Sequence, residues 1–434
     1  MAERATWGSR VTFVLSAIGF AAGIGNFWRF PYLVGKYGGG VFLAFYLLVV
    51  TLIGIPLLSI EIALGKTTKK DPVGAYKKLA PGKFWHVTGY LNLLTILLII
   101  GYASVVGGWI VAYCFKTATG TFAHMTPARI GSYFGDFTAK PVEVILWTVL
   151  FIASLVAVLL QGLNRGIEKV NKVMLPALFV LIVILMLRAL TLPGIEKGLS
   201  FYLKPQLSRF TREGALAAIG QAFFSVGVAM AAGLVYGSYL KDEERVVSNA
   251  VIIGGADTLV AVLAGFIIFP ATAAFSLEPG AGPGLTFITM PNVFNQMPLG
   301  NLFGTLFYLL FFLAAFTSFI GGSEAVVAHL SDEWNLPRKT GVWVTLLLML
   351  AIAVPSAIYS QVFATLDRFA NNYLLIIGGL LMTLFVGWIW PLENFFAAAG
   401  IQSKPLKAFW AFAIKFFAPL TITLLWLNQL GFVH

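Results

Sequence analysis

The stretch from residue 19 to residue 31 places glycines, an asparagine and an arginine in the middle of a long apolar segment. It runs Gly-Phe-Ala-Ala-Gly-Ile-Gly-Asn-Phe-Trp-Arg-Phe-Pro. Gly23 and Gly25 each weaken a helix by roughly 1 kcal/mol relative to alanine. Asn26 and Arg29 are costly inside a membrane, where polar side chains usually have a function. Because a broken helix is tolerated at membrane depth only where it lines a cavity or binds a ligand, the sequence predicts a membrane helix interrupted for a functional reason.

The composition places the whole chain in a membrane. Of 434 residues, 59% are hydrophobic and 11% are charged, whereas a soluble domain carries roughly 25% charged residues. The net charge of +11 does not indicate nucleic-acid binding, because the lysines and arginines fall between apolar segments. With one cysteine, Cys114, and four scattered histidines, the sequence offers no intramolecular disulfide and no cysteine-based metal cluster. It shows no nucleophile–base set either, which argues against an enzyme.

Eleven apolar segments are long enough to cross a bilayer as helices. They are residues 11–34, 41–64, 85–115, 142–161, 173–192, 216–240, 247–275, 299–330, 341–358, 369–390 and 409–430. The first segment runs on past the point where a cleavable signal peptide would end, so we expect it to stay in the protein. We therefore predict an all-α polytopic membrane protein with eleven transmembrane helices, forming one domain over residues 1–434.

The positive charges of the short loops give the expected orientation. Lysines and arginines gather between the second and third segments, the fourth and fifth, the sixth and seventh, and the eighth and ninth. All of these loops fall on one side, which the positive-inside rule makes cytoplasmic. We therefore expect the N-terminus inside and the C-terminus outside.

Two of the segments are interrupted at matching positions of two blocks. The first block covers residues 11–192 and the second 216–390, and residues 409–430 follow as an extra span. The sixth segment, which opens the second block, contains Ser-Val-Gly-Val-Ala at 225–229. Five spans per block invert the second block relative to the first, and paired interrupted helices in inverted halves are typical of a transporter's binding site. The alternative interpretation is that these small residues only let helices pack closely.

Several oxygen-bearing side chains lie at membrane depth, and they suit a sodium ion. A hard cation takes about five or six oxygen ligands, which unwound backbone and polar side chains supply together. Asp257 is the most informative, because it lies in the apolar run 251–269, where a carboxylate must be paired, protonated or bound to a cation. A hydrogen bond to another helix is the alternative role. The other candidates are Asn26, Ser225, Thr317 and Ser318, whereas Glu61 and Glu324 lie nearer span ends and suggest structural roles.

Five motifs resemble the neurotransmitter:sodium symporter family. They are Gly-Ile-Gly-Asn-Phe-Trp-Arg-Phe-Pro-Tyr at 23–32, Gly-Gly-Gly at 38–40, Gly-Ile-Pro-Leu at 54–57, Gln-Ala-Phe-Phe-Ser at 221–225 and Ala-Ala-Phe-Thr-Ser at 314–318. The resemblance extends over essentially the whole chain and is similar to the eleven-span bacterial LeuT-type and MhsT-like amino-acid transporters. It implies the LeuT fold, an inverted repeat of five plus five spans with broken helices 1 and 6. It also implies a multi-pass protein of the bacterial plasma membrane that is a monomer or weak dimer.

The resemblance implies two sodium sites and a substrate pocket. The site called Na1 would use the Ala21 carbonyl with Asn26, Ser225 and Asp257. The site called Na2 would use the carbonyls of Gly19, Ala22 and Ala314 with the hydroxyls of Thr317 and Ser318. The implied substrate-binding positions are Phe20, Ala21, Gly23, Gly25, Ile99, Ala103, Phe224, Ser225, Gly227, Met230, Ser318, Phe319 and Gly322, with Phe224 as an aromatic lid.

The resemblance also implies the moving parts. Arg29 and Asp367 look like an outer gate pair. The residues that look like an inner gate are Arg4, Trp7, Tyr239 and Asp332. Gly166 and Pro176 fit a glycine–proline pattern of the family at the start of the fifth span, which implies that this end of the span unwinds and lets the Na2 ion leave.

The residues around Asp257 predict that chloride is not needed. Chloride-dependent family members balance their sodium ions with a bound anion, and the matching positions here are Tyr46, Gln221, Ser225, Asp257 and Ala261. A carboxylate at Asp257 supplies the negative charge locally. We therefore expect transport without chloride.

One position departs from the family. Family members usually have a tyrosine in the third span, six residues before the tryptophan of Gly-Gly-Trp, and this chain has Ala103 there. Tyr102 is adjacent, but on a helix its side chain points about 100° away from that of residue 103. We therefore do not expect Tyr102 to replace the family's tyrosine. Ala103, Gly227 and Gly322 are all small, which leaves room for a bulky apolar or aromatic substrate side chain. Met230 offers an adaptable wall.

These features predict a sodium-coupled symporter that imports a small zwitterion by alternating access, with a hydrophobic or aromatic L-amino acid as the favoured substrate. Two alternatives stay open, namely an amine or betaine substrate and a non-transporting sensor on the same fold. A channel would need a continuous polar lining, whereas the polar residues cluster at mid-depth. Sodium, the small-molecule substrate and membrane lipid are the expected partners.

Overall fold

The computed structural model describes residues 5–277 and 282–432, and that part of the chain is helical. Within it, β structure is limited to an isolated bridge between Gly39 and Pro205. Nine helical spans of the described residues are long and apolar enough to cross a membrane. Their bounds are Gly40–Thr68 (α3, η2, α4), His86–Ala118 (α6), Pro141–Leu159 (α8), Leu163–Ala189 (η3, α9), Val246–Ala274 (α13), Gly300–Glu333 (α15), Arg338–Ile358 (α16), Ser360–Ile389 (α17, η6, α18, η7) and Lys404–Gln429 (α20, η8, α21). The predicted all-α membrane fold is thereby confirmed.

The first predicted span is broken where its glycines lie. α1 (Arg10–Ala21) ends just before Gly23, whose backbone is extended, and a short 3-10 turn (η1, Ile24–Asn26) and α2 (Arg29–Lys36) follow. The two parts of the span meet at an angle of 60°, and together they count as a tenth span. The interruption expected at Gly23 and Gly25 is confirmed.

The sixth predicted span is broken too, between α11 (Arg212–Val226) and α12 (Ala232–Ser238). Gly227, Ala229 and Ala231 have φ values of +71°, +59° and +64°, and positive φ is incompatible with a right-handed helix. Neither half is long enough to cross a membrane alone. For this reason the structure does not reproduce the expected eleven spans as continuous helices. The division into two inverted blocks, 11–192 and 216–390, stays a prediction.

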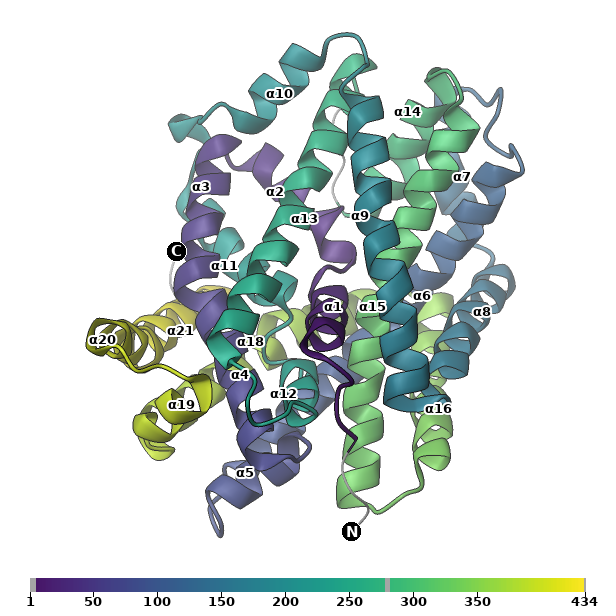
Figure 1. Cartoon of the computed structure of the whole chain (residues 1–434). Helices are drawn as coiled ribbons and strands as arrows, with labels where there is room; N and C mark the ends of the chain where they lie inside the picture. Colours follow the sequence, from purple (N-terminus) through teal and green to yellow (C-terminus); the bar gives the residue numbers. More distant parts are fainter. Residues whose placement is uncertain (1–4, 278–281, 433–434) are drawn as a thin grey trace.

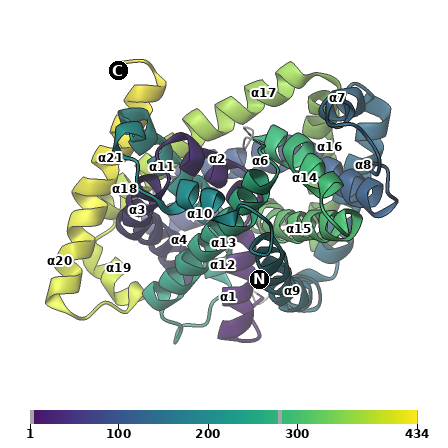
Figure 2. The same cartoon turned by 90° about the horizontal axis from the view of Figure 1, so that it is seen from above.

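Short helices mark the two ends of the bundle (Figure 1). α5 (Pro72–Leu79) lies at the end that holds the N-terminus, whereas α10 (Ile195–Leu203) and α14 (Met290–Gln296) lie at the opposite end. α7 (Pro127–Thr138) also lies toward that opposite end. α19 (Leu392–Ala399) packs on α4 and contacts α20, and α20 and α21 lie at the edge of the bundle (Figure 2). We call these ends the N-terminal end and the opposite end, because the orientation across the membrane stays a prediction.

Helices pack around the breaks of the two spans, whereas the start of α1 lies at the edge of the bundle (Figures 1 and 2). α1 packs against α15, α13 and α9, and α12 packs against α4. The α4–α12 contact depends on Gly65, because a Cβ there would lie 1.9 Å from the Leu234 carbonyl oxygen. Small residues allow membrane helices to approach this closely. The unwound backbone of both breaks is therefore shielded from lipid, as a broken membrane helix requires.

The start of the fifth span is helical in this structure. A π-helical turn covers Leu163–Glu168 (η3), and α9 (Lys169–Ala189) follows it directly with Pro176 inside. Gly166 lets this wide turn pack on α8, because a Cβ there would lie 2.2 Å from the Val158 carbonyl oxygen. The unwinding implied for residues 166–176 is therefore not a feature of this conformation, and as a step of transport it stays a prediction.

Candidate transport site

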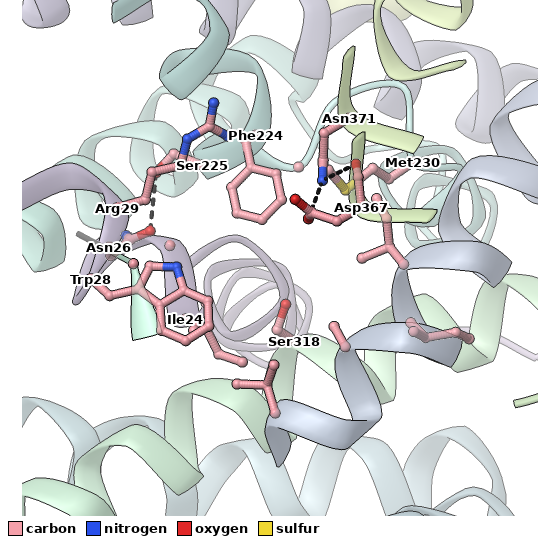
Figure 3. Close-up of a pocket in the computed structure, with 18 of the residues that line it drawn as sticks. Ile24, Asn26, Trp28, Arg29, Phe224, Ser225, Met230, Ser318, Asp367 and Asn371 are labelled. Atoms are coloured by element: carbon pink, nitrogen blue, oxygen red, sulfur yellow. Dashed lines mark hydrogen bonds between the residues drawn. The ribbon is translucent and has the colours of Figure 1, made fainter. Parts of the chain in front are cut away.

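A cavity of about 410 Å³ lies between the break of the first span, α6, the end of α11 and α15 (Figure 3). Its size and its mixture of apolar walls with a few polar groups are typical of a small-molecule site. Most of the implied substrate positions line it, namely Phe20, Ala21, Gly23, Gly25, Ile99, Ala103, Phe224, Ser225, Gly227, Met230, Ser318 and Phe319.

Gly322 is the exception among the implied substrate positions. A Cβ at Gly322 would lie 2.7 Å from Ile100 Cγ2 and 2.9 Å from Ile96 Cδ1, and both isoleucines line the cavity. Gly322 therefore lies behind the cavity wall, where it lets α6 pack closely on α15. The expectation that it contacts the substrate is corrected accordingly.

Three side chains of the implied Na1 site meet beside the cavity. Asn26 Nδ2 donates to Asp257 Oδ1 over 2.6 Å and to the Asp257 carbonyl oxygen over 3.0 Å. Ser225 Oγ donates to Asp257 Oδ2 over 2.8 Å and lies 3.1 Å from Asn26 Oδ1, and Figure 3 draws the contact between Ser225 and Asn26. The three residues come from η1, α11 and α13. The cluster therefore joins both broken spans to the seventh span.

Asp257 is fully buried (0% exposed), and the groups that contact its carboxylate are neutral. Among the described residues, no lysine, arginine or histidine forms an ion pair with it. Burying a carboxylate without a counter-charge is expensive, so the cluster is suited to a bound cation. The described residues contain no group of three His, Cys, Asp or Glu side chains that could hold a transition metal. A carboxylate with amide and hydroxyl oxygens favours a hard cation instead.

The implied Na2 residues meet between α1 and α15. Thr317 Oγ1 donates to the Gly19 carbonyl oxygen over 2.9 Å and lies 3.3 Å from the Ala314 carbonyl oxygen. Ser318 Oγ donates to the Phe20 carbonyl oxygen over 2.8 Å. Carbonyl and hydroxyl oxygens of two helices therefore converge on one place, which is what a sodium ligand set requires.

The backbone at the end of α1 turns away from the helix. Ala22 has φ −73° and ψ 66°, so its carbonyl group leaves the regular hydrogen-bond pattern. Beyond the break, Ile24 and Gly25 open η1, and the first N–H groups of a helical turn have no acceptor within the turn. The break thus offers carbonyl oxygens, which suit a cation, and amides, which suit a carboxylate.

The implied outer gate residues line the cavity but lie apart (Figure 3). Asp367 Oδ1 accepts from Tyr102 Oη over 2.8 Å and from Asn371 Nδ2 over 2.9 Å. The Arg29 guanidinium lies 5.4 Å from the centre of the Phe224 ring. The described part of the chain contains no ion pair between Arg29 and Asp367. The outer gate pair is therefore not formed in this conformation.

Tyr102 lines the cavity beside Ala103. That it does not take the role of the family tyrosine at position 103 stays a prediction. Its hydroxyl donates to Asp367 and accepts from Asn371 Nδ2 over 3.0 Å. Residues 96, 99, 100, 102, 103 and 106 of α6 all line the cavity. At about 100° per residue they cover an arc of roughly 160°, a little less than half of the helix circumference, and Tyr102 and Ala103 both lie within that arc.

Trp7 seals the N-terminal end below the break. It is 2% exposed, and its Nε1 donates to the Tyr236 carbonyl oxygen over 2.9 Å. Its backbone amide donates to the Tyr239 carbonyl oxygen over 3.1 Å. These bonds hold the N-terminal segment against α12. Of the other implied inner gate residues, Arg4 lies outside the described residues, and Asp332 Oδ2 accepts from the Asp71 backbone amide over 2.9 Å.

A buried ion pair that the sequence did not indicate lies next to this seal. Glu324 is 0% exposed, and Arg338 Nη1 and Nη2 donate to its two carboxylate oxygens over 2.9 and 2.7 Å. Tyr239 Oη donates to Glu324 Oε1 over 2.8 Å, and Arg338 Nη2 donates to the Leu159 carbonyl oxygen over 3.2 Å. These bonds connect α12 to α15, α16 and the end of α8. In the sequence, Arg338 was one of several basic loop residues, which gave no signal of this contact.

Comparisons with known proteins agree with this geometry. The model of the sodium:neurotransmitter symporter family matches residues 4–129 and 137–432. This chain belongs to that family. The Bacillus subtilis protein named "Uncharacterized sodium-dependent transporter YhdH" is 35% identical over 98% of this chain and 97% of its own length. A protein of Haemophilus influenzae named "Uncharacterized sodium-dependent transporter" is 32% identical over 99% of this chain and 98% of its own length.

A solved structure supports the same assignment. The crystal structure of MhsT in complex with L-phenylalanine has a TM-score of 0.91 and 34% identity, and it covers 98% of this chain and 100% of the MhsT chain. The predicted LeuT fold is therefore confirmed. As a member of the sodium:neurotransmitter symporter family, the chain is a sodium-coupled membrane transporter.

The positions that match the anion site of chloride-dependent family members are buried. Tyr46, Gln221 and Ala261 are each 0% exposed. Neither polar atom of the Gln221 carboxamide has a hydrogen-bond partner among the described residues. A free donor of this kind is available to an anion if the charge of Asp257 is removed. Whether the transporter needs chloride stays a prediction.

Proposed function

We propose that this transporter imports a hydrophobic or aromatic L-amino acid with sodium bound at Na1 and Na2, without chloride, across a bacterial plasma membrane whose cytoplasmic side faces the N-terminus. The Asp257 cluster carries this proposal. It places a fully buried carboxylate at the junction of both broken spans, and its partners Asn26 and Ser225 line the cavity. A sodium ion there offsets the buried charge and lies next to the substrate.

The two ends of an α-amino acid suit the two kinds of group at the break. A carboxylate suits the amides of Ile24 and Gly25, and from there it also reaches a sodium ion held by Asp257. An amino group suits the Phe20 carbonyl oxygen and Ser318 Oγ, which lie within 2.8 Å of each other. With Na1 empty, the substrate carboxylate and Asp257 repel each other in a low dielectric. This repulsion supports coupling between sodium and substrate.

The apolar half of the cavity suits the substrate side chain. Ile99, Ala103, Val106, Met230 and Phe319 all line it. The small side chain of Ala103 leaves room for the substrate in this half of the cavity, and the methionine side chain adapts its shape to different apolar groups. MhsT, which this chain resembles in fold and sequence, has been solved with L-phenylalanine. That complex supports an apolar or aromatic amino acid here as well.

The conformation supports alternating access. The cavity extends to Arg29 and Asp367, the outer gate residues that lie apart here, whereas Trp7 closes the N-terminal end. Sodium at Na2 would hold α1 to α15, and substrate would draw Arg29 and Phe224 over the cavity. Release to the N-terminal side would then require the contacts of Trp7 to open.

Uptake by the purified protein in liposomes tests the proposal. The panel comprises apolar, aromatic and charged L-amino acids, betaine and simple amines, each with an inward gradient of sodium or of choline and with chloride or gluconate as the anion. We expect saturable uptake of one or more apolar or aromatic amino acids that needs sodium and not chloride. Binding without uptake would indicate a sensor, and uptake of betaine or amines alone would overturn the amino-acid assignment.

Ala103→Tyr is expected to shift selectivity toward small substrates. Filling this part of the cavity with a phenol should weaken binding of L-phenylalanine by about tenfold relative to L-alanine, since overpacking a site costs about 1–3 kcal/mol. Competition binding at fixed sodium measures the ratio. Tyr102→Phe is the control, because it changes the neighbouring residue without adding volume. An unchanged phenylalanine-to-alanine ratio would place the substrate side chain away from residue 103.

A further inference from the structure

Asn171 on α9 carries a buried oxygen atom that nothing in the described structure satisfies. The residue is 0% exposed, and its Oδ1 has no hydrogen-bond partner among the described residues. Its Nδ2 donates to Ser16 Oγ over 3.2 Å and to the Ile167 carbonyl oxygen over 2.9 Å. Because a carboxamide nitrogen has two protons, both are used. The contacts of α9 with α1 and within α9 therefore satisfy Asn171 Nδ2, whereas Asn171 Oδ1 is left without a hydrogen-bond partner among the described residues.

This oxygen points at the implied Na2 ligands. A Cβ at Gly19 would lie 3.0 Å from Asn171 Oδ1 and 3.3 Å from Thr317 Oγ1. Gly19 has no Cβ, so these two oxygens face the same narrow gap beside α1, which is also bordered by Thr317 Cβ, 3.0 Å from that Cβ position. Thr317 Oγ1 also contacts the Gly19 carbonyl oxygen there. Three oxygens from α9, α15 and α1 thus border one small space.

The space has more acceptors than donors. Thr317 has one hydroxyl proton, and three carbonyl oxygens lie within its reach, those of Gly19, Leu313 and Ala314. No proton is left for Asn171 Oδ1. An excess of buried oxygen acceptors is costly without a partner, and a hard cation is the partner that satisfies several of them at once.

We propose that Asn171 Oδ1 is a ligand of the sodium ion at Na2, in addition to the implied ligands from α1 and α15. This inference rests on the proposed sodium site. It adds a third helix to that site, since Asn171 belongs to α9. One turn earlier on the same span, Glu168 Oε1 accepts from the Gly8 backbone amide over 2.7 Å. Sodium at Na2 therefore stiffens the helix that holds the N-terminal segment, and its loss loosens that segment.

Sodium binding to the purified full chain without substrate tests the ligand directly. Thermal unfolding is followed as sodium replaces choline at constant ionic strength, and the midpoint of the stabilisation gives the apparent affinity. Asn171→Leu keeps the number and branching of the side-chain heavy atoms and removes the oxygen. We expect its sodium midpoint to rise by about tenfold, which corresponds to about 1.4 kcal/mol. Asn171→Asp, which keeps an oxygen, is expected to bind sodium at least as well as the wild type.

Two comparisons separate a ligand from a packing residue. Asn92→Leu is the matched control, since Asn92 is 1% exposed and its unpartnered Oδ1 faces Gly378 on α18. It should leave the sodium midpoint unchanged. If Asn171 is a ligand, Asn171→Leu should also alter the ratio of sodium affinity to lithium affinity. If Asn171 is only a packing residue, Asn171→Leu should lower the melting temperature without sodium and leave the sodium midpoint and the sodium-to-lithium ratio unchanged. Asn171→Ala replaces the leucine variant if that variant does not fold.

The outcomes also distinguish this inference from the proposed function. If the wild type is stabilised by sodium, Asp257→Asn weakens that effect and Asn171→Leu does not, the Asn171 inference is overturned and the sodium-coupled function stands. If sodium does not stabilise the wild type, the proposed sodium sites fail first, and the role of Asn171 fails with them.

Discussion

Asp257→Asn should raise the sodium concentration for half-maximal uptake by about tenfold or more. The substitution keeps the shape of the side chain and removes its charge. Two unit charges about 4 Å apart attract by about 4 kcal/mol at an effective dielectric constant near 20, and a carboxylate that binds sodium directly lies closer than that. Because Asp257 is 0% exposed, solvent cannot replace the lost attraction.

The same variant should make uptake sensitive to chloride. An asparagine leaves the two sodium ions without the local negative charge, and the nearby Gln221 side chain has a free Nε2 donor among the described residues. An anion bound by that donor would restore the balance. We expect chloride to stimulate uptake by Asp257→Asn and to leave the wild type unaffected when gluconate is the alternative anion.

Ser225→Ala is the comparison variant for Asp257→Asn. It removes the hydroxyl that lies 2.8 Å from Asp257 Oδ2 and keeps the charge. Its sodium midpoint should rise less than that of Asp257→Asn, and its uptake should stay independent of chloride. If Asp257→Asn shows the sodium and chloride dependence of the wild type, Asp257 is a helix-packing residue and the Na1 assignment is wrong.

The fold was predictable because its main constraint is local. Gly23 and Gly25 weaken a helix wherever they stand, and the structure breaks the first span at this point. The sixth span was recognisable by its small residues, although its positive-φ positions at Ala229 and Ala231 carry no sequence signal. Alanine does not favour that backbone region. The surrounding helices therefore impose these angles, and surrounding helices are not visible in a single segment.

The site was predictable only as far as its motifs reached. Asn26, Ser225 and Asp257 come from three segments, and the structure brings them within hydrogen-bond distance. Contacts outside the motifs were missed for a physical reason. The hydrogen bond from the Tyr102 hydroxyl to Asp367 joins α6 to α17, and neither segment by itself indicates that the two residues meet. Asn171 lies on α9, whereas the Na2 motif residues lie on α1 and α15. Its position in the sequence does not indicate that it faces them.

The second large effect is expected at the N-terminal end, where Arg338→Met removes the cation that neutralises Glu324. Glu324 is 0% exposed, and leaving a buried carboxylate without its partner costs about 3–5 kcal/mol. We expect a clear loss of thermal stability in detergent. We also expect weaker closure of the N-terminal end, because Tyr239, which donates to Glu324 and accepts from the Trp7 amide, loses a fixed partner.

Two further variants show whether this loss comes from the buried charge. Lys407→Met breaks the exposed pair between Lys407 Nζ and Glu393 Oε2, which are 2.7 Å apart, and exposed pairs contribute about 0–1 kcal/mol. It should leave the melting temperature nearly unchanged. The double variant Glu324→Gln with Arg338→Met removes both charges and should recover most of the stability lost by Arg338→Met alone, since the cost lies in the unpaired carboxylate. If the double variant is no more stable than the single one, the contact of Arg338 with the Leu159 carbonyl oxygen at the end of α8 is what stabilises this end of the bundle.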